Sequence, residues 1–133
     1  MRLLVDTSAY SLFKRGHGGA RHVLGKATSV GVTAVILGEL LEGFARGRRE
    51  ADNRLELSAF LETPRVSILP MGLETAERFA RIHRLLRDSR RNMPTNDLWI
   101  AASAMEHGMT VLTADDHFTW IPTLLVEFLT RES

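Results

Sequence analysis

The amino-acid sequence predicts an α/β fold with a central parallel sheet of four to five short strands flanked by helices. Short apolar runs alternate along the chain with longer stretches in which apolar residues recur at helical spacing. Such alternation is typical of a parallel sheet, because the crossover between two parallel strands usually carries a helix. The chain has 133 residues, of which 44% are hydrophobic. This is a common size for one core, so we expect residues 1–133 to form a single domain.

The expected strands are short and largely apolar. The first carries Leu3, Leu4 and Val5 and ends at an acid, Asp6. Another is closed by Pro70, which has no backbone N–H to offer to a sheet. The five expected strands are residues 1–6, 30–33, 66–69, 110–113 and 123–128.

Six helices are expected among these strands. Several should begin at a side chain that accepts a hydrogen bond from a free N–H of the first turn. These starts are Thr7 with Ser8, Thr33, and Thr95 with Asn96. The long helix at residues 73–90 is expected to turn one face towards the core, with Ala76, Phe79, Ala80, His83 and Leu86 inward. The others are residues 9–13, residues 20–25, a helix opening at Thr33, residues 54–61, and a helix from the Thr95–Asn96 cap to residue 106.

Composition excludes several kinds of site. The chain has no cysteine, which removes disulfides, thiolate zinc sites and cysteine nucleophiles and favours a reducing compartment. The five histidines are dispersed and lack the spacing of a zinc site. The apolar run before Asp6 is too short for a signal peptide, and no stretch approaches the ~20 apolar residues of a membrane span. We therefore expect a cytoplasmic protein with no membrane partner.

The net charge is +1, and the basic residues are almost all arginine, with Lys14 and Lys26 as the only lysines. Planar guanidinium groups suit phosphate recognition. An arginine-biased genome explains the same composition equally well. The charge therefore permits an RNA partner without indicating one.

Two acids stand out in the first third of the chain. Asp6 follows a buried strand, and the carboxyl ends of parallel strands form the edge where ligands bind. A role as the N-cap of the next helix explains Asp6 equally well. Glu39 lies among apolar residues of a core-facing helix, where an unpaired carboxylate would neutralise itself. Glu39 therefore needs a partner.

More acids follow in the last third. Asp97 heads a helix face that continues with Ile100, Ala101 and Ala104. A favourable contact with the helix dipole is an alternative, although that role would suit the solvent face better. Asp115 and Asp116 follow the strand at residues 110–113, where an acidic turn is the alternative explanation.

The combination of these acids points to chemistry. Carboxylates collected at one sheet edge repel each other unless a cation neutralises them. Oxygen ligands of this number select Mg²⁺ or Mn²⁺ over zinc. Such a centre suits hydrolysis of a phosphodiester bond, because the ion activates water and neutralises the phosphate. The residues thus predict a metal-dependent nuclease.

Four short segments carry a resemblance to a known family. In this order, and at these separations, they resemble the motifs of PIN-domain nucleases, most of all the VapC toxins of toxin–antitoxin pairs. The resemblance covers essentially the whole chain. The segments are Val5-Asp6-Thr7-Ser8, Gly38-Glu39-Leu40-Leu41-Glu42-Gly43, Thr95-Asn96-Asp97-Leu98-Trp99-Ile100-Ala101-Ala102 and Leu112-Thr113-Ala114-Asp115-Asp116-His117-Phe118.

The resemblance implies a PIN-like fold and a Mg²⁺- or Mn²⁺-dependent endoribonuclease. It also implies a toxin that a VapB-type antitoxin holds inactive and that usually forms a homodimer. By motif position the acidic quartet is Asp6, Glu39, Asp97 and Asp115, with Asp6 and Asp97 as the core metal ligands. By motif position Thr7, Ser8 and Thr113 orient these acids or the substrate phosphate, and Asp116 is an alternative fourth acid. From the residues alone, Glu42 could assist Glu39 three positions earlier, but a solvated glutamate on the helix surface explains it better.

Two other functions compete with this interpretation. A phospho-receiver domain needs an aspartate at the end of a central strand, but the strand at residues 66–69 ends at Pro70. A non-catalytic module with the same fold, which binds RNA or a protein, is the main alternative to the enzyme. Arginines at residues 84–91 follow the paired first half of their helix and suit contact with either RNA or the antitoxin.

Overall fold

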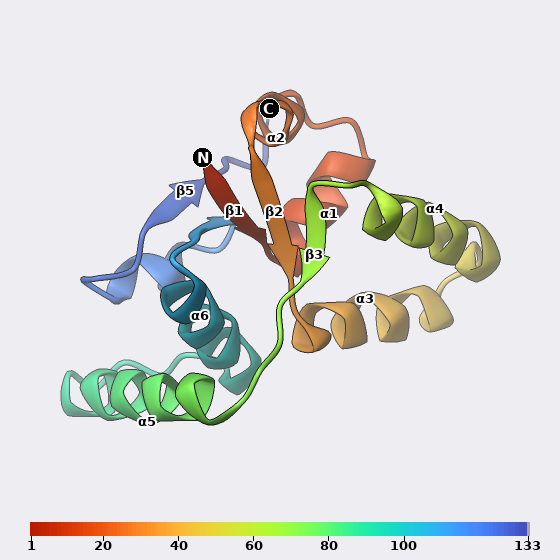
Figure 1. Ribbon diagram of the computed structural model, residues 1–133. Coiled ribbons are helices and arrows are strands. Elements are labelled where there is room, and N and C mark those ends of the chain that lie inside the picture. Colours follow the sequence, from red (N-terminus) through yellow and green to blue (C-terminus); the bar gives the residue numbers. More distant parts are fainter. Residues whose placement is uncertain (133) are drawn as a thin grey trace.

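The computed structural model describes residues 1–132 and contains one sheet of five strands, all parallel to their neighbours (Figure 1). The predicted parallel sheet is confirmed at the upper end of the expected strand number. The last strand is shorter than predicted, because the chain turns at Ile121, whose carbonyl accepts a hydrogen bond from Leu124 N. The strands are β1 (Arg2–Val5), β2 (Ser29–Val32), β3 (Val66–Ile68), β4 (Thr110–Thr113) and β5 (Val126–Phe128).

Helices fill the connections between the strands. In Figure 1 the α3–α4 pair and the α5–α6 pair lie on opposite sides of the view, with the sheet between them. Within residues 1–132, no helix has the length and apolar character that crossing a bilayer requires. The helices are α1 (Thr7–Lys14), α2 (Gly18–Lys26), α3 (Ala34–Arg46), α4 (Glu50–Glu62), α5 (Leu73–Asp88) and α6 (Thr95–His107), with a 3₁₀ turn η1 (Asp116–Trp120).

The strand order is β3-β2-β1-β4-β5, so β1 is the central strand. The chain moves outward from β1 to β2 and β3, then returns to the other side of β1 to form β4 and β5. At the carboxyl ends of β1 and β4 the connections leave in opposite directions, which opens a crevice where α/β proteins bind ligands. Pairing of Val5 with Leu112 sets the register there, and Asp6 N donates to Leu112 O at 3.2 Å.

The core lies on both faces of the central strands. Leu3, Leu4 and Val5 of β1 have no exposed surface, and neither do Val111 and Leu112 of β4. Strands covered on both faces are apolar throughout rather than alternating, which explains the short unbroken apolar runs in the sequence. The two strands that meet at the crevice are thus fixed by burial on both sides.

Helix α5 presents a different face to the core from the one predicted. Its buried residues are Thr75, Ile82 and Leu86, with Phe79 half-buried. His83 is exposed, and its ring stacks on Phe79 with a centroid distance of 5.9 Å. The prediction of an inward Ala80 and His83 was wrong, since both are exposed. The polar Thr75 and the apolar Ile82 complete the helical spacing of the contact face instead.

Candidate active site

A pocket of about 400 Å³ opens at the carboxyl edge of the sheet. Four acids singled out in the sequence line it: Asp6, Glu39, Asp97 and Asp115. They come from four places in the chain, namely the end of β1, the middle of α3, the first turn of α6 and the loop after β4. The other residues that line the pocket are Thr7, Ser8, Pro94, Thr95 and Asn96.

Asp6 is almost fully buried, with 2% of its surface exposed. Its Oδ1 accepts hydrogen bonds from Ala9 N at 2.8 Å and from Ser8 Oγ at 2.7 Å. Its Oδ2 accepts one from Thr113 Oγ1 at 2.6 Å. Asp6 is therefore the N-cap of α1 and a wall of the pocket at once, so the two explanations of this residue do not exclude each other.

Burial raises the pKa of Asp6 to about 6, even though the three donors favour the charged form. The negative charge of Asp115 adds to the increase. A carboxylate with three donors and a raised pKa is one whose charge lacks a counter-ion.

Two hydroxyl groups join the end of β4 to the start of α1. Thr113 Oγ1 donates to Asp6 and accepts from Asp115 N at 2.9 Å. Ser8 Oγ donates to Asp6 and accepts from Ala114 N at 3.0 Å. The hydroxyl groups of Ser8 and Thr113 thereby tie the loop that carries Asp115 to Asp6.

Glu39 lies on α3, which begins after β2 at Thr33, whose Oγ1 accepts from Ile36 N at 3.3 Å. Glu39 Oε1 accepts from Thr7 Oγ1 at 2.6 Å, and Oε2 accepts from Asn96 Nδ2 at 3.2 Å. The partner that this half-buried acid needed is thus a pair of neutral donors from α1 and α6.

Asn96 has a different role from the predicted helix cap. The N-cap of α6 is Pro94, which makes no side-chain cap bond, and Asn96 lies inside the first turn. Its amide instead joins α6 to Glu39. Its place next to Asp97 in the third motif was the only sign of this role in the sequence.

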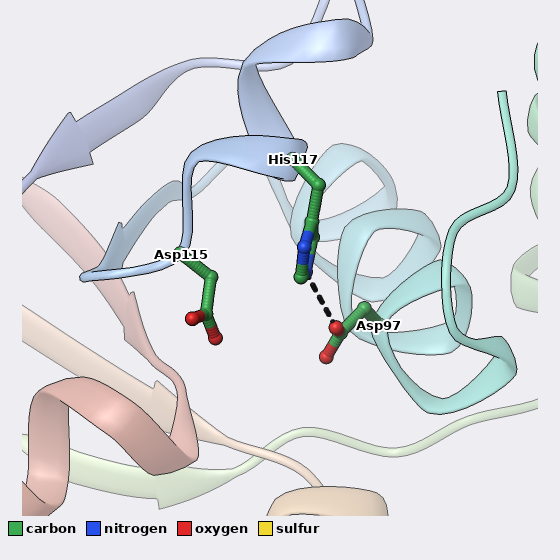
Figure 2. Close-up of side chains that lie close together, drawn as sticks. All are labelled: Asp97, Asp115 and His117. Carbon is green, nitrogen blue, oxygen red and sulfur yellow. Dashed lines mark hydrogen bonds and ion pairs between the residues drawn. The ribbon is translucent and has the colours of Figure 1, made fainter.

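Asp97, in the first turn of α6, forms a short contact with a histidine of the turn η1. His117 Nε2 lies 2.6 Å from Asp97 Oδ2, and Figure 2 shows this bond reaching from η1 to α6. Burial raises the pKa of Asp97, His117 opposes that increase, and the charges of Glu39 and Asp115 add to it. Sequence reasoning did not assign His117 to the site; its position next to the Asp115–Asp116 pair was the available signal.

Asp97, Asp115 and His117 form a group suited to a cation. Their ligand atoms all lie within 4.8 Å of one another, and Figure 2 shows the Asp115 carboxylate facing the Asp97–His117 pair. Asp6 and Glu39 line the same pocket outside this group. Carboxylate oxygens with one imidazole nitrogen suit Mn²⁺ well and Mg²⁺ through the oxygens. Burial without a counter-ion, together with the charges of neighbouring acids, raises the pKa values of Asp6 and Asp97. A bound divalent cation would relieve both effects, so the donor set fits a metal.

Comparison with known proteins agrees with this geometry. The model of the PIN domain family matches residues 3–123, a span that holds all four acids of the pocket. The chain belongs to the PIN domain family. Ribonuclease VapC1 of Rickettsia felis is 33% identical to this PIN domain over 115 residues, which cover 85% of the chain and 84% of the relative. The resemblance to VapC proteins is therefore confirmed.

Solved structures show the same fold. The DNA-bound VapBC of Salmonella typhimurium matches the PIN domain with a TM-score of 0.83 over 96% of this chain and 98% of that one, at 20% identity. VapBC-5 of Mycobacterium tuberculosis, a member of the VapBC family of toxin–antitoxin systems, matches with a TM-score of 0.74 at 28% identity. The match to VapBC-5 covers 97% of this PIN domain chain and 98% of the VapBC-5 chain.

Two further acids lie outside the pocket of this PIN domain. Glu42 is exposed on α3 and pairs with Arg46 at 2.7 Å. Asp116 is exposed at the start of η1, whereas its neighbour Asp115 lines the pocket. Asp115 also pairs with Arg131 near the end of the chain, at 3.0 Å.

Proposed function

We propose that this PIN domain is a metal-dependent endoribonuclease that hydrolyses RNA phosphodiester bonds with Mg²⁺ or Mn²⁺ bound by its carboxylates. The observation that carries the proposal is the convergence of four acids from four elements in one pocket. They lie at the point of the sheet where ligands bind in this class of fold. The ribonuclease name of the Rickettsia felis relative supports RNA as the substrate.

Each acid has a proposed task. Asp97 and Asp115 hold the cation together with Asp6, and Glu39 completes the site directly or through water. A bound divalent cation neutralises the phosphate and activates the attacking water. Thr7, Ser8 and Thr113 keep the acids in one orientation through the hydrogen bonds already described. Fixed acids need no reorganisation when the reaction begins, which lowers the barrier.

We also propose that the protein is the toxin of a toxin–antitoxin pair. The solved VapBC complexes of the same fold support a VapB-type antitoxin as its protein partner. We further propose a homodimer and a cytoplasmic location, as the resemblance to VapC toxins implies, with residues 1–133 as one nuclease domain; the family match over residues 3–123 supports the single domain. In this setting the antitoxin keeps the RNA out until it is removed.

The decisive test replaces Asp97, the acid that bonds to His117 and whose pKa the charges of Glu39 and Asp115 raise further. Purified protein is incubated with total cellular RNA in Mg²⁺, in Mn²⁺ and in chelator, beside Asp97→Asn and the control Asp52→Asn. Asp52 is an exposed acid of α4 that pairs with Arg49. We expect discrete cuts that need metal, a loss on the order of a hundredfold or more in Asp97→Asn, and full activity in the control.

Two results would contradict the proposal. Cleavage by Asp97→Asn at the wild-type rate would remove this residue from the centre. If no RNA were cleaved in any lane and neither cation changed the melting temperature, the non-catalytic module that binds RNA or protein would be favoured.

A further inference from the structure

A second hollow, of about 260 Å³, lies at the C-terminal end of α5. Three arginines line it, Arg87, Arg90 and Arg91, together with the polar side chains of His83 and Asn92. Beneath them Leu86 and Leu98 are buried, each 2% exposed. The accessible groups of the hollow are therefore cationic and polar.

These arginines are not neutralised by acids. Among residues 1–132, none of the three makes an ion pair with a carboxylate, whereas Arg78 on the same helix pairs with Glu74 at 3.1 Å. The negative end of the helix dipole accounts for a cation at Arg87, in the last turn. It does not account for three guanidinium groups around one hollow, since like charges repel unless an anion lies between them.

The backbone conformation of Arg90 is a second indication that the arginine cluster has a function. Its φ is +57°, the left-handed conformation that normally selects glycine at this position after a helix. The turn is closed by hydrogen bonds from Arg91 N to Leu86 O at 2.8 Å and from Arg90 N to Arg87 O at 3.0 Å. Arg90 thus carries a long cationic side chain at a position where the backbone conformation favours glycine. Non-glycine residues in this conformation are often found at functional sites.

The hollow adjoins the candidate active site. Pro94 to Asp97 line the carboxylate pocket, while Asn92 and Met93, directly before them, line the hollow. Asn92 and Asp97 are five positions apart in the chain, so their Cα atoms lie within ~18 Å of each other. That distance corresponds to about five nucleotides of a stacked strand at roughly 3.4 Å each.

Arg91 also reaches towards η1. Its guanidinium lies over the Trp120 ring at 5.0 Å, and the centroid of that ring is 5.8 Å from that of His117, the partner of Asp97. In Figure 1 the end of α5 and the η1 turn lie on the same side of the molecule. Aromatic stacking holds this guanidinium in place without neutralising it.

We propose that Arg87, Arg90 and Arg91 bind a backbone phosphate of the RNA strand on one side of the cut. The proposal rests on the proposed ribonuclease function for its ligand. RNA is favoured over a protein partner because the hollow offers guanidinium and amide groups beside the site of phosphodiester chemistry. It lacks the exposed apolar anchor around which protein interfaces are usually built.

The test uses Arg90→Gly, a change that removes the guanidinium and suits the backbone. The probe is a fluorescent single-stranded oligoribonucleotide of about 20 nucleotides, long enough to span both hollows. Binding is measured in chelator, so that nothing is cleaved. We expect an affinity loss of about tenfold and a salt dependence whose slope falls by about 0.7 for the lost phosphate contact. The melting temperature should stay constant or rise.

Arg87→Gln and Arg91→Gln are expected to weaken binding in the same way. The matched control is Arg81→Gln, which removes an exposed arginine of the same helix that does not line the hollow. This control should bind the RNA as the wild type does. In the presence of cation, Arg90→Gly should raise KM for a long RNA while kcat is kept, because the contact is remote from the cut bond.

Unchanged affinity and salt slope in all three hollow variants would overturn the proposal and leave the hollow to a protein partner. The proposal would also be overturned if Arg90→Gly lowered the melting temperature while Arg87→Gln and Arg91→Gln bound RNA normally. That result would give the arginines a structural role. Cleavage is scored separately. If the hollow variants bind RNA more weakly but the wild type cuts no RNA, the phosphate site is supported and the nuclease is refuted. If the variants bind RNA normally and cleavage depends on Asp97, the nuclease is supported and the phosphate site is refuted.

Discussion

Asp6 shows how one side chain holds the fold together and also faces the pocket. It caps α1, bonds to the end of β4 and lines the cavity, while almost none of it is exposed. In its charged form it is surrounded by neutral donors and by other acids. The folded protein without a cation therefore prefers Asp6 protonated at a pH where the unfolded chain has already lost the proton.

The stability of the metal-free protein should fall as pH rises. Asp6 has a folded pKa of about 6 against 3.8 for the ordinary group, so its favourable contribution is complete below about pH 4 and is lost as pH rises through about 6. Asp97, whose pKa is also raised, acts in the same direction. We expect a loss of about 2 kcal/mol from Asp6, measured by urea unfolding in chelator between pH 4 and pH 7.

Asp6→Asn is the control for this pH profile, because asparagine is also a good N-cap and does not titrate. The difference in unfolding free energy between wild type and variant should change across pH 4 to 6 and level off above. Parallel profiles for the two proteins would show that Asp6 keeps its ordinary pKa in the folded state.

Among single residues, the sequence located those whose signal is local. Asp6 and Asp115 follow apolar strands, and Asp97 heads an apolar helix face, so each could be placed at the sheet edge in advance. His117 and Asn96 could not, because their partners, Asp97 and Glu39, lie 20 and 57 residues away in sequence. Nothing in a local pattern encodes which of several polar side chains meets a distant acid.

The packing around strand β2 depends on a glycine, Gly31. A Cβ built on Gly31 would lie 2.8 Å from Leu69 Cδ1 and 2.9 Å from Met109 Sδ. Both neighbours are buried, with 7% and 3% of their surfaces exposed, so neither has free space to move into. Leu69, just after β3, and Met109, just before β4, pack so closely against β2 that only glycine fits at position 31.

Two glycine substitutions should have opposite effects on stability. Gly31→Ala is expected to destabilise the protein by about 1 kcal/mol or more through overpacking. Gly38→Ala, in the middle of α3, places its Cβ where no atom lies within 4 Å, and should stabilise by about 0.5–1 kcal/mol. Thermal unfolding of both variants beside the wild type measures the contrast, and two changes of equal sign would contradict it.

Elements were predicted best where hydrophobic pattern and capping agree. The strand at residues 110–113 and the start of the helix after Thr33 were correct to the residue, since burial and a side-chain cap define them. The end of the chain was predicted with too much strand, because the apolar run at residues 123–128 pairs with β4 only over its second half. The face of α5 was misjudged because Thr75, a polar residue, is buried there and accepts a hydrogen bond from Gly72 N through its hydroxyl.

At the scale of the molecule, the acidic pocket links folding to cation binding. A cation that binds only the folded protein stabilises it by about 2.7 kcal/mol at a hundred times its Kd. Mg²⁺ or Mn²⁺ should therefore raise the melting temperature of the wild type, and chelator should reverse the rise. Asp97→Asn should melt higher than the wild type in chelator, because one repelling charge is gone, and should gain little from cation.

Differential scanning calorimetry of both proteins at neutral pH measures these shifts. Equal stabilisation of wild type and Asp97→Asn would place the bound cation elsewhere on the surface. A wild type that melts at the same temperature with and without either ion would refute the metal centre as a whole.

The strand order also affects when the pocket forms during synthesis. Asp6 lies on the strand that becomes the middle of the sheet, but Thr113, which holds its carboxylate, is synthesised 107 positions later. Because a chain emerges from its N-terminus and β1 gains its second neighbour only when β4 is made, no early fragment contains the complete pocket. The cluster of acids thus stays unassembled until the segment that carries β4 has been made, and we expect products cut short before β4 to leave RNA intact.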